Sequence, residues 1–466
     1  MKAKLPLLSP ARAAAFEVLE RVATQNAFAS NLLTATRYDK LSREDRGLLQ
    51  ELTLGVLRWQ GRLDFLIERH TRREIDKLDL EAVIALRLGL YQLLYLTRVP
   101  AFAAINESVN LVKEHGKIQA AGLVNGVLRS AQRELEFNIL PSSKSPVHRT
   151  SIETSHPVWL VKRWIARFGE ADTRELALAN NKVPATSFRF NPNRKPVEEV
   201  KADLELRKIK IRPSSLTPEA YVVEDGSLPA TSEPVQQGWV YLQDEASQLI
   251  GRLALKLIAE KQPAKVLDLC SAPGSKANLI ASELRPDSLV VAADLHQHRM
   301  RTIKELSARL GVENINLVRL NAEQDLPFPA ESFDLVLLDA PCSGLGTLQR
   351  NPEIKWRMNE AKIAELADLQ KRLITSASKQ LKPGGILLYS VCSTEPEEGE
   401  EVVAWFRRQH PDYSEATREE LSKLGTEAAN LPISTVGART FTHRHGSESF
   451  FLCVLRKENN QEIKSS

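Results

Sequence analysis

Cysteine is scarce in this 466-residue sequence, and its placement excludes two kinds of small scaffold. The four cysteines all lie in the second half of the chain, at Cys270, Cys342, Cys392 and Cys453. No pair has CxxC spacing, and no cysteine and histidine residues cluster at the spacing of zinc ligands. We therefore expect neither a disulfide framework nor a metal site.

Long apolar runs are also missing. The longest clean apolar stretch, residues 88–97, is far shorter than the ~20 residues that span a bilayer. The charged start at residues 1–6 is not followed by the apolar core of a secretion signal. These absences predict a cytoplasmic protein in a reducing compartment, with no membrane partner.

Charge of one sign is not in large excess either, since 63 lysine and arginine residues face 59 aspartate and glutamate residues. The excess lies near the N-terminus, where residues 1–150 hold 22 basic and 16 acidic side chains. A basic N-terminal third favours a polyanion as partner. Solvated faces of exposed helices explain the same charges equally well.

The hydrophobic pattern of the first third is helical throughout. Apolar residues recur at i, i+3, i+4 and i+7, and residues 81–95 are almost entirely apolar, which predicts a buried central helix. We therefore predict an all-α bundle over residues 1–138. Its expected helices are residues 11–22, 45–67, 81–95, 101–115 and 120–133.

A Pro- and Ser-rich linker is expected at residues 138–155, because proline and serine interrupt regular structure. The chain beyond it mixes helical and extended patterns, and predicts a small α/β lead-in over residues 151–240. Its expected elements are a helix at 158–168, a strand at 185–191, a helix at 196–206 and extended segments within 209–223.

Apolar strands alternate with helices from about residue 240 onward. Such alternation is typical of a parallel sheet with helices on both faces, so residues 241–458 predict an α/β Rossmann-like domain. The expected strands are 264–269, 288–294, 316–320, 333–339 and 385–390, and the expected helices are 275–284, 296–310 and 360–380.

The first strand of that domain leads into a turn of small residues at 270–276, Cys-Ser-Ala-Pro-Gly-Ser-Lys. Backbone N–H groups of such a turn, at the start of a helix, can approach an anionic ligand closely. Asp294 ends the second strand, where a carboxylate accepts both ribose hydroxyls of a nucleoside. GxGxxG and GxxxxGK[ST] are both absent, so S-adenosylmethionine is favoured over NAD or a phosphate ligand. An ordinary βα turn without a ligand is the alternative.

Two cysteines follow the ends of two later strands of this domain. Cys342 comes shortly after Asp339, and Cys392 follows the next strand. A thiolate is needed where the carbon to be methylated is a poor nucleophile, as is C5 of cytosine, because addition to C6 makes C5 enamine-like. A single cysteine is more often a small buried hydrophobic residue, and we interpret Cys270 and Cys453 in that way.

These motifs resemble the Sun/RsmB family of RNA (cytosine-5)-methyltransferases, in particular the bacterial 16S ribosomal RNA methyltransferase B type. The most specific matches are Asp-Ala-Pro-Cys-Ser-Gly at 339–344, Arg-Asn-Pro-Glu-Ile-Lys-Trp-Arg at 350–357, and the segment 381–393 with its Tyr-Ser-Val-Cys-Ser. Further matches lie at 155–164, 189–191 and 243–247 and, in the first domain, at 86–95, 104–109 and 124–129. The first domain is similar to a NusB-type RNA-binding module.

The resemblance implies a substrate, a cofactor and a role for each site residue. The substrate is 16S ribosomal RNA, presented as a loop or a flipped-out cytosine to a protein expected to be a monomer, and the cofactor is S-adenosylmethionine. Cys392 is the implied nucleophile, and Cys342 is the second cysteine, which product release needs. Asp339 and Lys276 are implied to hold the base. The implied cofactor-binding residues are Cys270, Ser271, Ala272, Pro273, Gly274, Ser275, Lys276, Asp294, Asn321 and Asp339.

Six positions depart from the usual pattern of that family without removing a reacting group. Ser275, Asn321, Val391, Gly399, Glu448 and Ser449 stand where Gly, Asp, Thr, Asn, Asp and Gly are usual. They leave the substrate open, and the same chemistry on transfer RNA is one alternative. A non-catalytic RNA-binding scaffold, similar to an antitermination factor, is another, although two intact cysteines argue against it. A DNA cytosine methyltransferase is disfavoured because those enzymes lack the second cysteine motif.

Overall fold

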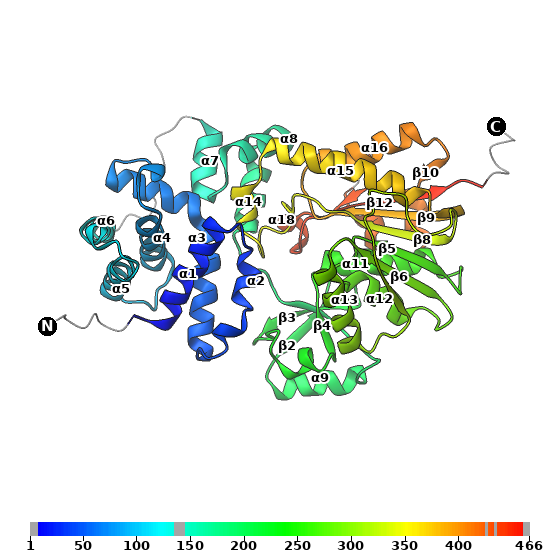
Figure 1. Cartoon of the computed structure of the whole chain (residues 1–466), viewed down its shortest axis with the longest axis horizontal. Coiled ribbons are helices and arrows are strands. Elements are labelled where there is room, and N and C mark those ends of the chain that lie inside the picture. The colour runs from blue at the N-terminus through cyan, green and yellow to red at the C-terminus, as the bar shows by residue number, and fades with distance from the viewer. Residues whose placement is uncertain (1–7, 135–144, 425–426, 433–435, 460–466) are drawn as a thin grey trace. The chain divides into compact units, whose positions relative to one another are not determined.

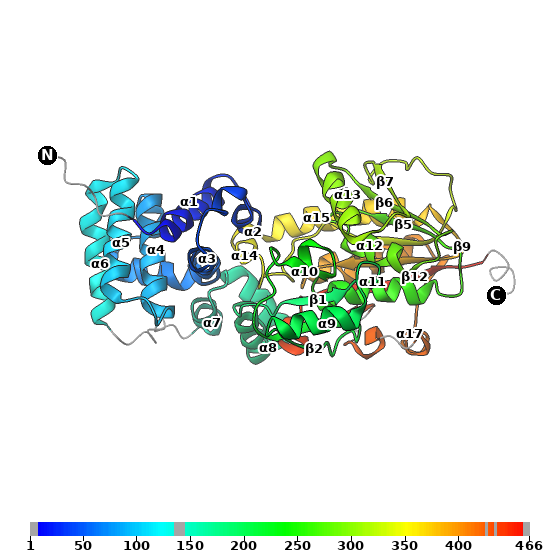
Figure 2. The same ribbon diagram turned by 90° about the horizontal axis from the view of Figure 1, so that it is seen from below.

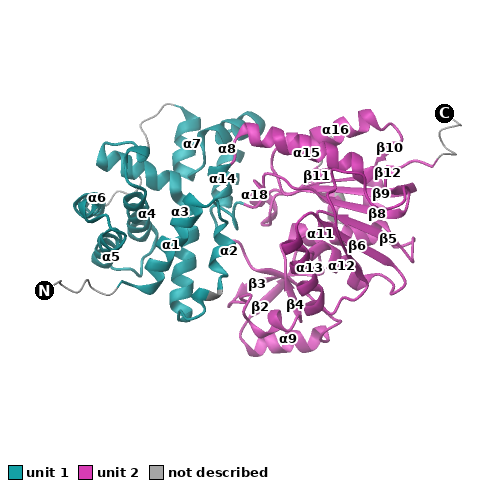
Figure 3. Ribbon diagram, viewed as in Figure 1, with its two compact units in different colours: residues 1–183, 348–357 teal, residues 184–347, 358–466 magenta. Residues whose placement is uncertain are grey.

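The computed structural model describes residues 8–134, 145–424, 427–432 and 436–459, and the chain divides into two compact units (Figure 3). Unit 1 comprises Met1–Val183 and Leu348–Arg357, and unit 2 comprises Pro184–Thr347 and Met358–Ser466. The short insert Leu348–Arg357 therefore belongs to unit 1, although the residues on both sides of it in sequence belong to unit 2. The division into 1–138, 151–240 and 241–458 remains a prediction.

Unit 1 begins with a helical bundle, and all five helices expected there are present. The central helix α4 (Leu80–Tyr95) is buried on almost every side, and α3, α5 and α6 pack against it (Figure 2). The other helices of the bundle are α1 (Pro10–Thr24), α2 (Ala29–Leu33), α3 (Arg43–Thr71), α5 (Ala101–Glu114) and α6 (Ala121–Arg133), with short 3₁₀ turns at Thr36–Tyr38, Ile75–Lys77 and Ile118–Ala120.

The linker expected at residues 138–155 is wrong over its second half. Residues 135–144 lie outside the described ranges, but α7 (Pro146–Thr154) is a helix. Its N-cap, Ser145, accepts a hydrogen bond from a main-chain N–H of the first turn, and Pro146 takes the first helical position. A serine followed by a proline begins a helix as readily as it interrupts one, because proline at this position loses no hydrogen bond.

The helix expected at residues 158–168 is longer than its pattern indicates. In α8 (Val158–Asn180), Gly169 has φ 81° and ψ 171°, outside helical geometry, and the chain resumes as a helix after it. Glycine adopts this backbone conformation without strain. The second part of α8 buries Leu176 and Ala177. Glycine usually ends a helix, so the sequence pattern predicts an end just before Gly169.

The insert from the second half of the chain is packed into unit 1 and carries α14 (Ile354–Arg357). The indole N–H of Trp356 donates to the main-chain oxygen of Leu57 at 3.0 Å. The ammonium of Lys355 donates to the main-chain oxygen of Arg58 at 2.8 Å and to the Asn181 side-chain oxygen at 3.1 Å. The motif at 350–357 is therefore a structural part of the helical unit.

Unit 2 begins with a small antiparallel sheet, which corresponds to the expected α/β lead-in. Its strand order is β2-β3-β1-β4, and Phe188 and Phe190 of β1 lie in its core. The elements are β1 (Ser187–Phe190), α9 (Val197–Leu206), β2 (Lys210–Pro213), β3 (Ala220–Asp225), α10 (Glu233–Gln236) and β4 (Val240–Leu242).

The large sheet of unit 2 has the strand order β10-β12-β9-β8-β5-β6-β7, with β11 paired to β12. The strands from β9 to β7 are parallel, as expected, whereas β10, β11 and β12 are antiparallel. An apolar pattern indicates a strand but not its direction, so this part was not predicted. The strands are β5 (Lys265–Leu269), β6 (Leu289–Asp294), β7 (Ile315–Arg319), β8 (Phe333–Asp339), β9 (Leu381–Val391), β10 (Tyr413–Glu415), β11 (Ala438–Arg439) and β12 (Phe451–Lys457).

Helices cover both faces of the large sheet (Figure 1). Alternate strand residues point to opposite faces. Val266 packs toward α11, α12 and α13, whereas its neighbour Leu267 packs toward α15 and α16. The elements are α11 (Glu245–Leu257), α12 (Ser275–Glu283), α13 (Gln297–Leu310), α15 (Glu360–Ser378), α16 (Glu400–Gln409), α17 (Arg418–Lys423) and α18 (Thr442–His445), with 3₁₀ turns η4 (Pro396–Glu398) and η5 (Glu427–Asn430). Across the described ranges, no helix combines the length and apolarity needed to cross a membrane.

Candidate active site

The two strand-end cysteines meet at one edge of the large sheet. Strands β8 and β9 are parallel neighbours, and Asp339 is paired in register with Ser390. The loops that follow these residues bring Cys342 and Cys392 together, with 3.2 Å between their sulfur atoms. Both side chains are partly exposed, so a substrate can reach them. Because the carboxyl ends of parallel strands share an edge, the sequence predicted this meeting.

An ion pair between a buried lysine and a partly exposed aspartate lies at the same edge. The ammonium of Lys276 is 2.6 Å from one carboxylate oxygen of Asp339, and the hydroxyl of Ser390 donates to the other at 2.8 Å. Burial alone lowers the pKa of Lys276, but the charge and hydrogen bond of Asp339 outweigh it, so the net pKa is raised. Lys276 is therefore a fixed cation beside the cysteines.

The thiol of Cys342 holds its proton firmly. The hydrogen bond to Cys392, burial and the charge of Cys392 together raise the pKa of Cys342 well above its ordinary value. Burial also raises the pKa values of Cys270 and Cys453, and Cys453 lies within β12. A raised pKa keeps a thiol protonated and unreactive at neutral pH.

The turn at 270–276 is tight and leads directly into α12. The hydroxyl of Ser271 donates to Asp268 at 2.8 Å, and its N–H donates to the main-chain oxygen of Ala293. Gly274 has φ 94°, and a Cβ there would lie 2.8 Å from the side chain of Ile303. A glycine is required at this point both for its conformation and for space.

Two carboxylates face this turn. Asp294 is 4% exposed, and its oxygens accept from the N–H groups of His296 at 3.0 Å and Ala272 at 3.4 Å. Asp268 is not among the predicted cofactor-binding residues, although an acidic residue within the strand just before the turn is a visible signal. One of its oxygens is buried without a partner, and burial raises its pKa to about 7.

These groups fit the sulfonium nucleoside that the turn predicts. Asp294 offers carboxylate oxygens to ribose hydroxyls, and the unpartnered oxygen of Asp268 requires a hydrogen-bond partner. Asn321 follows β7, and its side-chain oxygen accepts from the N–H of Glu323 at 3.0 Å. A carbonyl oxygen has a second lone pair, so Asn321 can still accept from an adenine amino group. Ser275 accepts from Arg189 through its main-chain oxygen at 3.5 Å.

Other departures from the usual pattern have local structural roles. Gly399 has no room for a side chain, because a Cβ would lie 2.8 Å from Arg439 and Phe451. The N–H of Ser449 donates to the main-chain oxygen of Gly346 in the loop after Cys342. The N–H of Glu448 donates to Asp244 at 3.2 Å. Val391 is fully buried in the sheet.

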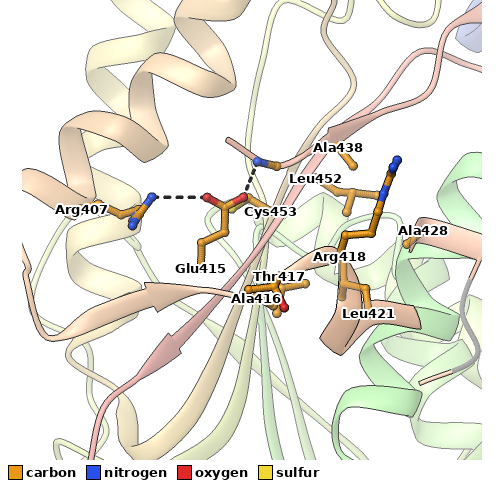
Figure 4. A pocket seen from close by; sticks show the side chains of 12 residues that line it. Arg407, Glu415, Ala416, Thr417, Arg418, Leu421, Ala428, Ala438, Leu452 and Cys453 are labelled. Atoms are coloured by element: carbon orange, nitrogen blue, oxygen red, sulfur yellow. Dashed lines mark hydrogen bonds and ion pairs between the residues drawn. The ribbon is translucent and has the colours of Figure 1, made fainter. Parts of the chain in front are cut away.

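A separate hollow of about 330 Å³ lies along the antiparallel strands β10, β11 and β12 (Figure 4). Its central carboxylate, Glu415, accepts from the N–H of Gly437 at 2.6 Å and pairs with Arg407 at 3.4 Å. Neither the Cys342–Cys392 pair nor the turn at 270–276 lines this hollow. Within the described residues, no three or more histidine, cysteine or acidic side chains cluster as metal ligands.

Comparisons with known proteins match each part of the chain. Residues 254–456 match the family described as 16S rRNA methyltransferase RsmB/F, residues 9–133 match the NusB family, and residues 156–227 match a ferredoxin-like domain of RsmF/B-like methyltransferases. The chain is similar to two curated proteins along nearly its whole length. One, from Bacillus subtilis (strain 168), is named "Probable ribosomal RNA small subunit methyltransferase B" and is 32% identical over 95% of this chain and 98% of its own.

The other, "Ribosomal RNA small subunit methyltransferase B" of Klebsiella pneumoniae (strain 342), is 34% identical over 99% of this chain and 100% of its own. A solved structure, that of PH0851, has the same fold. It aligns with a TM-score of 0.77 at 24% identity, and covers 97% of this chain and 100% of that one.

Proposed function

The chain belongs to the RsmB/F family of 16S rRNA methyltransferases, and on that premise we propose that it methylates carbon 5 of one cytosine in 16S ribosomal RNA through a covalent cysteine adduct. One observation carries the proposal: the sulfur atoms of Cys342 and Cys392 lie 3.2 Å apart beside the Lys276–Asp339 pair. Methylation of a nitrogen needs no thiol, because an amine attacks a methyl sulfonium directly. Two thiols at the reacting edge favour carbon as the acceptor.

Cys392 starts the proposed reaction as a thiolate. Its sulfur forms a bond to C6 of cytosine, and the electrons of the C5–C6 double bond become available at C5. S-adenosylmethionine held by Asp294 and the turn at 270–276 would supply an electrophilic methyl group to C5, and S-adenosylhomocysteine would be the leaving group. A base then removes the C5 proton, the electrons re-form the C5–C6 double bond, and the C6–sulfur bond breaks to return the thiolate of Cys392.

Lys276 and Asp339 are suited to hold the base during these steps. The Watson–Crick edge of cytosine offers N3 and O2 as acceptors and N4 as a donor. An ammonium donates to the acceptors, and a carboxylate accepts from N4, so the pair matches cytosine. Uracil reverses the polarity at positions 3 and 4 and would leave both groups poorly matched.

Cys342 is proposed to act as the base at the end of the reaction. Two of the three largest causes that raise its pKa are its hydrogen bond to Cys392 and the charge of Cys392. Both disappear once the sulfur of Cys392 is bonded to C6. Cys342 is then proposed to give up its own proton and to take the C5 proton as the general base.

The remaining parts of the chain are proposed to bind cofactor and RNA. Asp294 and Asp268 accept hydrogen bonds from the cofactor, and the turn at 270–276 holds its charged end. C5 of a stacked cytosine is shielded, so the target is flipped out or lies in a loop, at a cost of a few kcal/mol. The NusB-like helices of unit 1 are proposed to provide part of the RNA surface.

Methyl transfer to purified RNA tests this function. We expect tritiated methyl groups from S-adenosylmethionine to enter 16S ribosomal RNA that lacks the modification, and nucleoside analysis to identify 5-methylcytosine. Bisulfite mapping then locates the nucleotide. Label in an N-methyl or ribose-methyl nucleoside contradicts the carbon chemistry, and label in transfer RNA alone contradicts the proposed substrate.

A further inference from the structure

A buried carboxylate outside this mechanism joins the two loops that carry the cysteines. Glu398 lies at the end of η4 and is 0% exposed. One of its carboxylate oxygens accepts from the N–H of Ser343 at 2.7 Å and from the side chain of Gln370 at 3.2 Å. The other accepts from the hydroxyls of Ser343 and Ser393. All four donors are neutral groups.

The position of the two serines gives these contacts their meaning. Ser343 comes directly after Cys342, and Ser393 comes directly after Cys392. Their hydroxyls lie 3.1 Å apart and share one oxygen of Glu398. A single carboxylate therefore bridges the residues next to both reacting thiols.

The bridge supplements few direct links between the loops. The main chain joins them where the N–H of Gly346 donates to the oxygen of Cys392 at 3.0 Å. The hydroxyl of Tyr389 also donates to the main-chain oxygen of Glu398 at 2.6 Å, which anchors η4 to β9. Burying a carboxylate is costly, and burial raises the pKa of Glu398, with its hydrogen bonds opposing the shift. An apolar residue would avoid this cost, so the carboxylate has a use beyond packing.

We propose that Glu398 is a positioning residue that sets the separation of Cys342 and Cys392 by holding Ser343 and Ser393. Glu398 does not touch the substrate; it acts through the two serines. The inference rests on the proposed function for its kinetic consequence, because release needs Cys342 close to the atom that Cys392 has attacked. Its geometric content is independent of that function.

Disulfide formation measures the separation directly. In the full-length protein, hydrogen peroxide oxidises the two thiols, which lose two protons and two electrons and form a bond between Cys342 and Cys392. Peptide mapping by mass spectrometry measures this disulfide and distinguishes it from any disulfide that includes Cys270 or Cys453. We expect Glu398→Ala to form it at least 10-fold more slowly than the unaltered protein. Glu398→Gln keeps one acceptor and the shape of the bridge, so it should recover most of the rate.

Turnover gives a second readout. A misplacement of about 1 Å can cost about 100-fold in rate. We expect Glu398→Ala to lower kcat by that order while KM for S-adenosylmethionine is unchanged, and to accumulate the covalent RNA adduct on a denaturing gel. Glu401→Ala, a solvent-exposed glutamate on α16, is the matched control and should behave as the unaltered protein.

A folded Glu398→Ala protein that forms the disulfide at the unaltered rate overturns the inference. If this variant does not fold, Ser393→Ala replaces it, because it removes one arm of the bridge with little change in volume. An unchanged disulfide rate in that variant also overturns the inference. Failure of the proposed function is distinguishable, since the unaltered protein would then transfer no methyl group to cytosine whatever the disulfide rates.

Discussion

Lys276 in unit 2 and Lys355 in unit 1 are buried to a similar degree, with 7% and 1% exposure, yet their pKa values shift in opposite directions. The pKa of Lys276 is raised, because the nearby carboxylates Asp339 and Asp268 outweigh its burial. The pKa of Lys355 is lowered well below its ordinary value by burial and by the charge of Arg58. Among the described residues, the ammonium of Lys355 donates only to neutral groups, the main-chain oxygen of Arg58 and the side-chain oxygen of Asn181.

The difference separates a lysine that is proposed to act in the reaction from one whose contacts are structural. A buried ammonium paired with a carboxylate stays charged and can polarise a substrate. A buried ammonium held by amide oxygens fixes the chain segment that carries it, at an electrostatic cost. The same residue type therefore has a different use in each unit, and substitutions at the two positions should fail in different assays.

The largest expected effect is on catalysis at the first of these lysines. Lys276→Met removes the cation that is proposed to hold the base, and the loss of one such donor costs about 100- to 1,000-fold in kcat. The melting temperature should change little, whereas kcat should fall strongly. Lys304→Met, at an exposed position on α13, is the matched control for a lost charge. An unchanged kcat in the Lys276 variant would remove Lys276 from the site.

Substitution of Lys355 should lower the stability of the fold. Lys355→Ala removes two hydrogen bonds and opens a cavity in unit 1, and large-to-Ala changes in cores cost roughly 2–5 kcal/mol. We expect a loss of stability near the lower end of this range, because the substitution also removes the electrostatic cost of burying an ammonium. Denaturant titration measures the loss, and Lys40→Ala, at an exposed position of unit 1, should show none. A loss of kcat with full stability would mean that Lys355 serves the reaction instead.

Asp294, a carboxylate of unit 2 that does not pair with Lys276, should affect cofactor affinity. Asp294→Ala removes acceptors for two ribose hydroxyls, each worth a net ~0.5–1.5 kcal/mol, so cofactor affinity should fall about 10- to 100-fold. Calorimetric titration with S-adenosylmethionine measures this. Unchanged affinity would exclude Asp294 from the cofactor site and leave its role to the turn contacts alone.

The smallest effect is a pH dependence of stability from Lys355. Its pKa is lower in the folded state than in the unfolded state, so the unfolded chain binds more protons between the two values. Stability should therefore rise with pH across that window, up to about pH 10.5, by at most about 1.4 kcal/mol per pH unit. Lys276 acts in the opposite sense, because its contribution is lost as pH rises through its raised pKa. Denaturant titrations of Lys355→Met at several pH values should show a flatter slope than the unaltered protein, and an equal slope would contradict the assignment.

The sequence predicted those parts of the site whose signals are local. Cys342, Cys392 and Asp294 each follow or end an apolar strand, and parallel strands bring such ends to one edge. Lys355 could not be interpreted in this way. Within residues 350–357 it has the appearance of an ordinary surface lysine, since its partners Arg58 and Asn181 are far away in sequence. Glu398 was missed because an acidic run before a helix is typical of an exposed helix start.

The most direct test of the account is whether the two cysteines fail differently on a denaturing gel with 16S ribosomal RNA. Cys342→Ser should complete addition and methyl transfer and then stall, so the protein migrates with RNA in the presence of S-adenosylmethionine. Cys392→Ser should form no adduct, because a hydroxyl is a far weaker nucleophile at neutral pH, and the double variant should form none either. An adduct with Cys392→Ser but none with Cys342→Ser would contradict the account, since it would make Cys342 the nucleophile.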